Sequence, residues 1–169
     1  FEVDCIIYAT GFEITTDAHR RVDFDTLGRN GLSLYKHWQE GFRTLHGLSA
    51  HGFPNWFTIG INQNGLSPNM TAMFDDQAVH VAYVINELQN RGLQVAEVTT
   101  EAEEAWIAQI VDAAGSGMAA TAFLESCTPG YYNREGNTSN INRQNSPYAP
   151  GINAFNALLK DWRDKGDLA

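Results

Sequence analysis

The chain has 169 residues, with 11 Lys or Arg against 20 Asp or Glu, and its formal net charge is −9. This acidic balance argues against nucleic acid as a partner, because proteins that bind nucleic acids use Lys and Arg to neutralise phosphates. No apolar run is long enough to span a bilayer, so no membrane partner is predicted. The two cysteines, Cys5 and Cys127, have neither metal-ligand spacing nor a disulfide framework, and a reduced, cytoplasmic setting is expected.

Residues 3–11 are expected to form a buried strand and a turn. The segment is apolar except for Asp4 at its start, which is typical of strands covered on both faces. Thr10 and Gly11 follow the strand, where glycine lets a ligand approach the main chain closely. Asp4 lies at the opposite end, so a structural hydrogen bond is expected of it rather than catalysis. Since a buried strand needs neighbours and few other strand candidates follow, we expect the chain to be the back part of a longer protein.

Residues 12–55 are rich in glycine and turn signals, with a helical turn expected within 32–38. A second buried strand is predicted at 56–60, started by Pro54-Asn55 and closed by Gly60.

Two long helices are predicted next. The segment 69–90 has apolar residues near i, i+3, i+4 and i+7 spacing and ends at Arg91-Gly92. The segment 100–115 is expected to open with a capping box formed by Thr100 and Glu103.

The last part of the chain differs in kind. Residues 116–150 lack periodicity and carry tyrosines among Gly, Ser, Asn and Pro, which favours a functional loop that orders against a ligand or a neighbouring domain. A final amphipathic helix is predicted at 152–165.

The five histidines show no metal-ligand spacing, so no metal site is predicted. A Ser-His-Asp hydrolase is excluded because the sequence has no G-x-S-x-G elbow.

Five sequence blocks occur in order along the chain. They are Asp4–Phe12 with A-T-G-F, Gly28–Trp38 with G-x-x-G-x-x-L-x-x-x-W, Gly52–Gly60 with G-F-P-N-x-F, Ser67–Met70 with S-P-N-M, and Thr100–Trp106. Together they resemble the Baeyer–Villiger monooxygenases, the class B flavin-dependent enzymes that insert one oxygen atom next to a ketone carbonyl. The resemblance implies an α/β fold, namely the C-terminal segment of a flavoprotein with two dinucleotide-binding domains. Residues 1–115 would form the C-terminal half of the FAD-binding domain, and residues 116–169 a loop-rich extension with a final helix.

The resemblance also implies cofactor and substrate sites. Thr10, Gly11, Asn69 and Met70 would contact FAD, with the loop 60–69 leading into a helix N-terminus that suits an electron-rich partner. The adjacent substrate side would be lined by Gly65, Leu66, Ser67 and Pro68. From the residues alone, Ser67 or Asn69 capping the helix, with Met70 beginning its apolar stripe, is the alternative.

A third expected site concerns NADPH. Ser126, Cys127 and Asn133 fall where the family has an S-W-Y-x-G-x-N loop tied to binding of this cofactor, with Cys127 in place of the tryptophan. That replacement indicates a differently shaped cofactor or substrate pocket.

Several family motifs are missing from these residues. Neither of the two G-x-G-x-x-G turns, nor the F-x-G-x-x-x-H-x-x-x-W-P fingerprint, nor the active-site arginine is present, so no catalytic residue is assigned and these parts are expected upstream in the same polypeptide. The expected partners are a small ketone, O2 and that upstream part. Two alternatives remain open: a flavin monooxygenase that oxygenates nitrogen or sulfur, and a non-catalytic truncated binding module.

Overall fold

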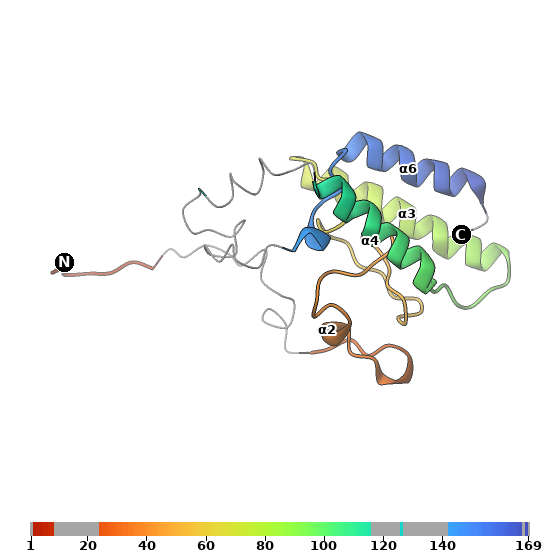
Figure 1. Ribbon diagram of the computed structural model, residues 1–169, viewed down its shortest axis with the longest axis horizontal. Helices are drawn as coiled ribbons and strands as arrows, with labels where there is room; N and C mark the ends of the chain where they lie inside the picture. Colours follow the sequence, from red (N-terminus) through yellow and green to blue (C-terminus); the bar gives the residue numbers. More distant parts are fainter. Residues whose placement is uncertain (1, 9–23, 116–125, 127–141, 167, 169) are drawn as a thin grey trace.

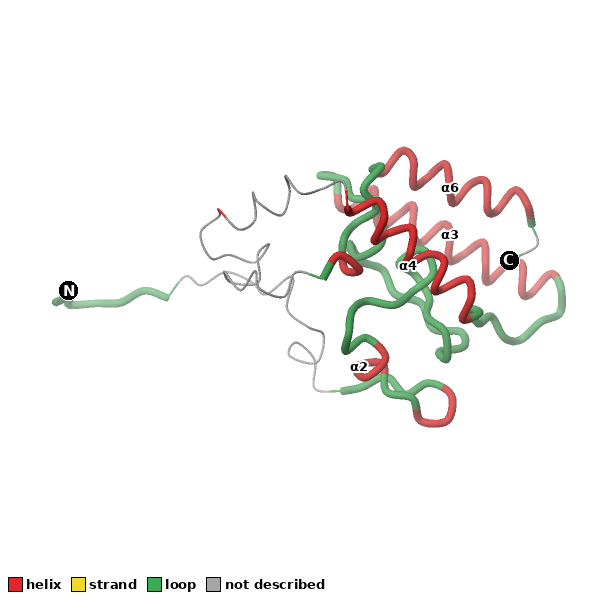
Figure 2. The backbone as a smooth tube through the Cα atoms, in the orientation of Figure 1, coloured by secondary structure: helices red, strands yellow, loops and turns green. Residues whose placement is uncertain are grey.

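The structure is a computed structural model that describes residues 2–8, 24–115, 126, 142–166 and 168. In this part the helical elements come in the order η1 (Arg29–Gly31), α2 (Leu34–His37), α3 (Met70–Asn90), α4 (Thr100–Gly115), η4 (Arg143–Asn145) and α6 (Ile152–Lys165). The long helices α3, α4 and α6 form one side of the molecule, and irregular segments with α2 form the other (Figures 1 and 2). No helix of the described residues is long and apolar enough to cross a membrane.

The predicted helices are confirmed. Segments 69–90, 100–115 and 152–165 fold as α3, α4 and α6, and the helical turn expected within 32–38 is α2. The start of α3 is fixed by Asn69, whose side chain accepts from the Ala72 N–H, and α6 ends at Gly166 in the left-handed conformation.

The predicted capping box of α4 is wrong. The cap is Thr99, whose Oγ1 accepts from the Ala102 N–H at 3.2 Å. Glu103 turns away from the helix start because its carboxylate is buried against residues of the preceding loops. The cap therefore lies one residue earlier than the sequence pattern suggests.

One core joins α4 to α6. Trp106 and Ile110 of α4 meet Phe155 and Leu159 of α6, and Tyr148 closes the cluster by stacking on Trp106 at 5.4 Å. Complete burial of side chains of this size contributes about 1.5–3 kcal/mol each. This contact fixes the segment before α6 against α4.

A second core lies under the irregular segments. Leu34 of α2 packs with Ala50 and Phe53, and the partly buried Trp38 and Trp56 cover them. The tryptophan rings meet edge to face at 5.6 Å. Aromatic packing thus orders a region that has few regular elements.

The two predicted strands are wrong for the described residues. Residues 2–8 are exposed, with Ile7 86% accessible, and they lie away from the helices (Figure 1). Residues 56–60 are irregular, and instead of a strand ladder they have the Thr58 N–H bond to the Leu48 carbonyl at 2.8 Å and side-chain bonds from Gln77 to Gly60. Strand pairing in the described part consists of two isolated bridges, Leu27 with Ser33 and Leu45 with Ser49. A strand forms only beside another strand, and this part of the chain supplies none.

The predicted α/β class is seen only in part within the described residues, which are helices and irregular segments without a sheet. The predicted division near residue 115 stays a prediction. The segment 142–166 lies against α3 and α4, with the Tyr83 hydroxyl donating to the Arg163 carbonyl at 2.8 Å.

Candidate functional site

The loop 60–69 leads into the N-terminus of α3 and is held at its beginning by that same helix. The buried side chain of Gln77 accepts from the Gly60 N–H at 3.0 Å and donates to the Gly60 carbonyl at 2.9 Å. Both polar groups of one backbone position are thereby satisfied by one side chain. The loop consequently leaves the preceding segment at a fixed point.

Gln63 holds the middle of the loop. Its side chain is fully buried, donates to the carbonyls of Phe42 and Gln144 at 2.6 and 2.8 Å, and accepts from the Thr44 hydroxyl at 2.5 Å. Its N–H donates to the Ser146 carbonyl at 3.0 Å, and its φ is 57°. A left-handed backbone is uncommon outside glycine, and these surrounding bonds hold Gln63 in it.

Asn64 continues this attachment. Its carbonyl accepts from the Tyr148 N–H at 2.8 Å, and its side chain donates to the Gly47 carbonyl at 3.2 Å. Its Oδ1 is buried without a hydrogen-bond partner among the described residues. The loop is thus joined to the segments before and after it at several points.

The far end of the loop is open. Leu66 and Met70 are 48% and 40% exposed, although both are apolar. Asn69 caps α3 by bonding the Ala72 N–H, which leaves the first-turn N–H groups of Met70 and Thr71 without partners among the described residues. These groups and the helix dipole favour an electron-rich or anionic group, and the apolar side chains favour a flat one.

The structure brings together some of the predicted site residues and not others. Leu66, Pro68, Asn69 and Met70 are exposed around the N-terminus of α3, and Ser67 is half-buried beside them. Gly65 is buried against α6, where an added Cβ would lie 2.7 Å from the Phe155 Cβ. Thr10, Gly11, Cys127 and Asn133 lie outside the described residues, and Ser126 is exposed. The capping role that the residues alone suggested for Asn69 is present, whereas Met70 does not join the buried stripe, which begins at Met73.

Sequence reasoning missed the two glutamines that hold the loop. Gln63 lies in the run Asn62–Asn64, three consecutive side chains that carry amides. Such a run in a loop is the sequence feature that could have indicated side chains bonded to the backbone of neighbouring segments. Gln77 lies in the middle of a helix, where a polar residue is ordinarily taken as solvent-facing.

A buried carboxylate connects α4 to the loops beside it. Glu103 is 1% exposed and accepts from His37 Nε2 at 3.1 Å, from Arg43 Nε at 3.1 Å and from the His51 N–H at 2.9 Å. Burial by itself raises the pKa of Glu103, but the bonds from His37 and His51 and the charges of His37 and Arg43 outweigh it, so the pKa is lowered. The Glu103 carboxylate is therefore a structural anion rather than a proton donor.

Two buried histidines meet between α3 and α6. The rings of His46 and His80 lie 5.8 Å apart, and Trp162 touches both. Burial, followed by the neighbouring His80, lowers the pKa of His46 to about 3. Burial, followed by the charge of Arg163, lowers the pKa of His80 to about 4. Both imidazoles are neutral near pH 7.

Metal chemistry has no support in the described residues, where no three His, Cys, Asp or Glu side chains come close enough to hold an ion.

Known proteins resemble the chain over its whole length. Neopentalenolactone D synthase of Streptomyces avermitilis is 41% identical over 171 residues, covering 100% of this chain and 28% of that protein. A Baeyer–Villiger monooxygenase of Streptomyces coelicolor is 39% identical over 168 residues, covering 98% of this chain and 26% of that protein. No family model matches the chain.

Solved structures agree with these relatives. A polycyclic ketone monooxygenase from the thermophilic fungus Thermothelomyces thermophila superposes with a TM-score of 0.77 at 34% identity, over 85% of this chain and 23% of that one. A steroid monooxygenase bound to NADP superposes with a TM-score of 0.64 at 25% identity, over 84% of this chain and 25% of that one. The resemblance stated from the five sequence blocks is confirmed. The chain spans about 28% of the length of the curated relatives that it matches.

Proposed function

Because the chain belongs to the Baeyer–Villiger monooxygenase family, we propose that it is the C-terminal part of the FAD-binding domain of such an enzyme. The whole enzyme would use NADPH and O2 to insert one oxygen atom next to a ketone carbonyl and give an ester or lactone. The substrate class is supported by the name of the fungal polycyclic ketone monooxygenase, and the nicotinamide cofactor by the NADP in the steroid monooxygenase structure.

The observation that carries the proposal is the open N-terminus of α3. Partnerless N–H groups of Met70 and Thr71 lie beside exposed Leu66 and Met70 side chains, and this combination fits the polar edge and the flat face of a flavin ring. Bound FAD, reduced by NADPH, would supply the oxygen chemistry. The residues of this chain would hold one edge of the ring with N–H donors and shield it from water with apolar side chains.

The substrate side would be built by the loop before the helix. Leu66, Ser67 and Pro68 follow the buried and bonded residues Gln63 and Asn64, so their backbone is fixed although the side chains of Leu66 and Pro68 are exposed. A fixed wall orients a small ketone better than a mobile one, because less freedom is lost on binding. Gly65 would contribute by letting the loop approach α6 closely.

Further elements of the proposal come from the sequence. Thr10 and Gly11 would approach FAD through the main chain, and Ser126, Cys127 and Asn133 would belong to the NADPH loop. The phosphate-binding turns and the arginine that assists the reaction would come from the rest of the polypeptide. A cytoplasmic location is proposed from the cysteine usage, and Cys5 is a free thiol.

The test begins with the visible spectrum of the longer polypeptide that contains this chain. We expect a yellow protein that NADPH bleaches and air recolours, and that converts a cyclic ketone to a lactone detected by mass spectrometry. A protein that oxidises NADPH but oxygenates only amines or sulfides would favour the related nitrogen- and sulfur-oxygenating class. A polypeptide that binds no flavin would contradict the proposal and favour the non-catalytic binding module.

A further inference from the structure

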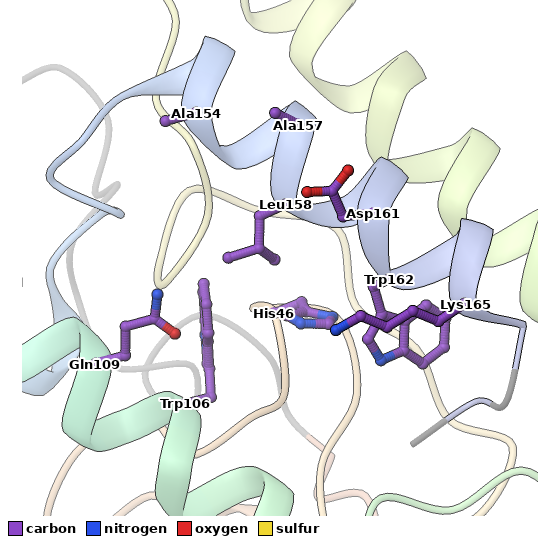
Figure 3. Close-up of a pocket in the computed structure, with 9 residues that line it drawn as sticks. All are labelled: His46, Trp106, Gln109, Ala154, Ala157, Leu158, Asp161, Trp162 and Lys165. Atoms are coloured by element: carbon purple, nitrogen blue, oxygen red, sulfur yellow. The ribbon is translucent and has the colours of Figure 1, made fainter.

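A pocket lies between α4 and α6, apart from the residues of the candidate flavin site. Its volume is about 510 Å³, and His46 forms part of its lining (Figure 3). Pockets that bind small molecules typically measure about 300–1,000 Å³. The pocket is therefore large enough for a ligand of one or two rings.

Aromatic rings surround His46 in this pocket. The ring of His46 meets those of Trp106 and Trp162 edge to face at 5.1 and 5.8 Å. Leu158 of α6 adds an aliphatic surface, and the small side chains of Ala154 and Ala157 leave the space beside it open (Figure 3). A flat apolar ligand fits such walls.

His46 itself is the unusual member. It is 6% exposed, and the Nε1 of the adjacent Trp106 is buried with no hydrogen-bond partner among the described residues. Its backbone also takes a left-handed conformation, with φ of 55°. A buried polar atom without a partner, next to a residue with a strained backbone, is uncommon in structural positions and frequent at binding sites.

The mouth of the pocket carries a cation. The side chain of Lys165 extends along Trp162 toward His46, and the amide of Gln109 approaches from α4 (Figure 3). Lys165 has no ion pair among the described residues, and the carboxylate of Asp161 is turned away from His46. The mouth thus favours an anionic group on the ligand.

We propose that this pocket binds a small planar aromatic carboxylate that carries a hydroxyl group. The ring would lie beside His46, against Trp106 and Leu158, the hydroxyl would donate to a ring nitrogen of His46, and the carboxylate would meet Lys165. A neutral imidazole accepts such a bond, and the lowered pKa of His46 is consistent with that state. The pocket shares no residue with the proposed flavin site, so this inference does not rest on the proposed function.

Isothermal titration of the full polypeptide with 4-hydroxybenzoate tests the proposal. We expect saturable binding of one molecule, with a dissociation constant of roughly 10 µM to 1 mM for a ligand of this size. Benzoate lacks the hydroxyl and phenol lacks the carboxylate, so each should bind more weakly. Absence of saturable binding of 4-hydroxybenzoate would overturn the proposal.

Variants then locate the binding. Ala157→Trp fills the pocket from an exposed position of α6 and should weaken binding at least tenfold while ketone turnover stays within about twofold of wild type. Lys165→Ala should weaken 4-hydroxybenzoate about fivefold and leave phenol unchanged. The control, Lys160→Ala on the same helix, removes a lysine that pairs with Asp164 instead and should change neither. Equal binding by wild type and Ala157→Trp would mean that the acid binds elsewhere and would refute the assignment.

Discussion

Gln77 satisfies both backbone groups of Gly60: its Oε1 accepts from the Gly60 N–H at 3.0 Å and its Nε2 donates to the Gly60 carbonyl at 2.9 Å. One side chain of α3 thus supplies bonds that a neighbouring strand would have supplied if residues 56–60 had formed the predicted strand. The loop that carries the candidate flavin site begins at this point. The geometry of the site therefore depends on a residue in the third turn of the helix that the loop precedes.

Replacing Gln77 by Leu should destabilise the protein. The variant leaves two half-buried backbone groups of Gly60 unpaired, which costs about 1–3 kcal/mol. The urea midpoint of the longer polypeptide measures the loss. Gln89→Leu, at an exposed position of the same helix, is the matched control and should lie within about 0.5 kcal/mol of wild type. Equal midpoints for the two variants would contradict the role assigned to Gln77.

Glu103→Gln tests the buried carboxylate. The amide keeps the shape but removes the charge that meets Arg43 and His37, so we expect a loss of about 2 kcal/mol at pH 7. The neighbouring Glu104 is 65% exposed and contacts the same arginine at 3.8 Å, so Glu104→Gln should change stability by less than about 0.5 kcal/mol. Chemical denaturation of both variants measures the free energy of unfolding and compares the two effects. A larger effect at Glu104 would show that burial is not what makes the Glu103 interaction strong.

The buried histidines should make the fold sensitive to mild acid. The pKa values of His46 and His80, about 3 and 4, lie below the ordinary value of 6.5, so the unfolded chain takes up protons that the folded chain does not. Stability should fall as the pH drops below about 6.5, by roughly 2 kcal/mol per histidine at pH 5. The free energy of unfolding, measured from pH 7 to 5, should fall about half as far in His80→Gln as in wild type.

Glu103 acts in a different range. Its lowered pKa stabilises the fold above the ordinary value of 4.5, and that contribution is lost only as the pH falls through the lower folded pKa. Glu103→Gln should therefore leave the slope between pH 6.5 and 5 unchanged. A changed slope in that interval would reassign the mild-acid response from the histidines to Glu103.

Met70→Glu tests the proposed flavin contact. A carboxylate at the first position of α3 would compete for the partnerless N–H groups and place charge against the ring, so FAD should bind about tenfold more weakly. Flavin fluorescence on dilution measures the dissociation constant. Val79→Glu adds the same charge at another exposed apolar position of α3 and should leave FAD binding unchanged. Equal weakening in both variants would indicate a general charge effect and not a contact at residue 70.

Gly65→Ala should strain the contact between the loop and α6. The added methyl group would lie 2.7 Å from the Phe155 Cβ and 2.9 Å from the Ile152 Cα, neither of which rotates away, so we expect a loss of about 1–3 kcal/mol. Gly60→Ala is the control, because nothing lies within 4 Å of its Cβ position. Thermal midpoints that are the same for both variants would show that the loop shifts without cost.

The helices could be predicted from the sequence because their signals are local. The apolar spacing of 70–90, the Gly92 after it and the spacing within 152–165 depend on neighbours in the chain alone. The strands could not be predicted as reliably. The apolar run at 3–8 has the composition of a buried strand, but the local sequence does not show whether a neighbouring strand is present to pair with it. The cap of α4 was predicted at Thr100 but is Thr99, since either of the two adjacent threonines could begin the helix. The choice depends on the tertiary contacts that bury Glu103, which the local sequence does not show.

The candidate site was predicted only in part for the same reason. Asn69 and Met70 lie at a helix start, which the sequence marks. Gln63, Gln77 and His46 contact partners that lie 17 or more residues away in the chain. The sequence around a polar residue does not show whether such distant partners are present. The resemblance of five short blocks to a family indicated the flavin and substrate sites, which local patterns do not indicate by themselves.

The exposed segment 2–8 has a practical consequence for anyone who produces this chain by itself. Val3, Ile6, Ile7 and Tyr8 are all more than half accessible, and the segment pairs with no strand of the described part. An extended apolar segment with open backbone groups recruits an identical segment from another molecule, as in cross-β stacking. The isolated chain should therefore form concentration-dependent aggregates seeded by its own first residues. Replacing Ile7 by Lys would interrupt that stacking and keep the rest of the chain in solution.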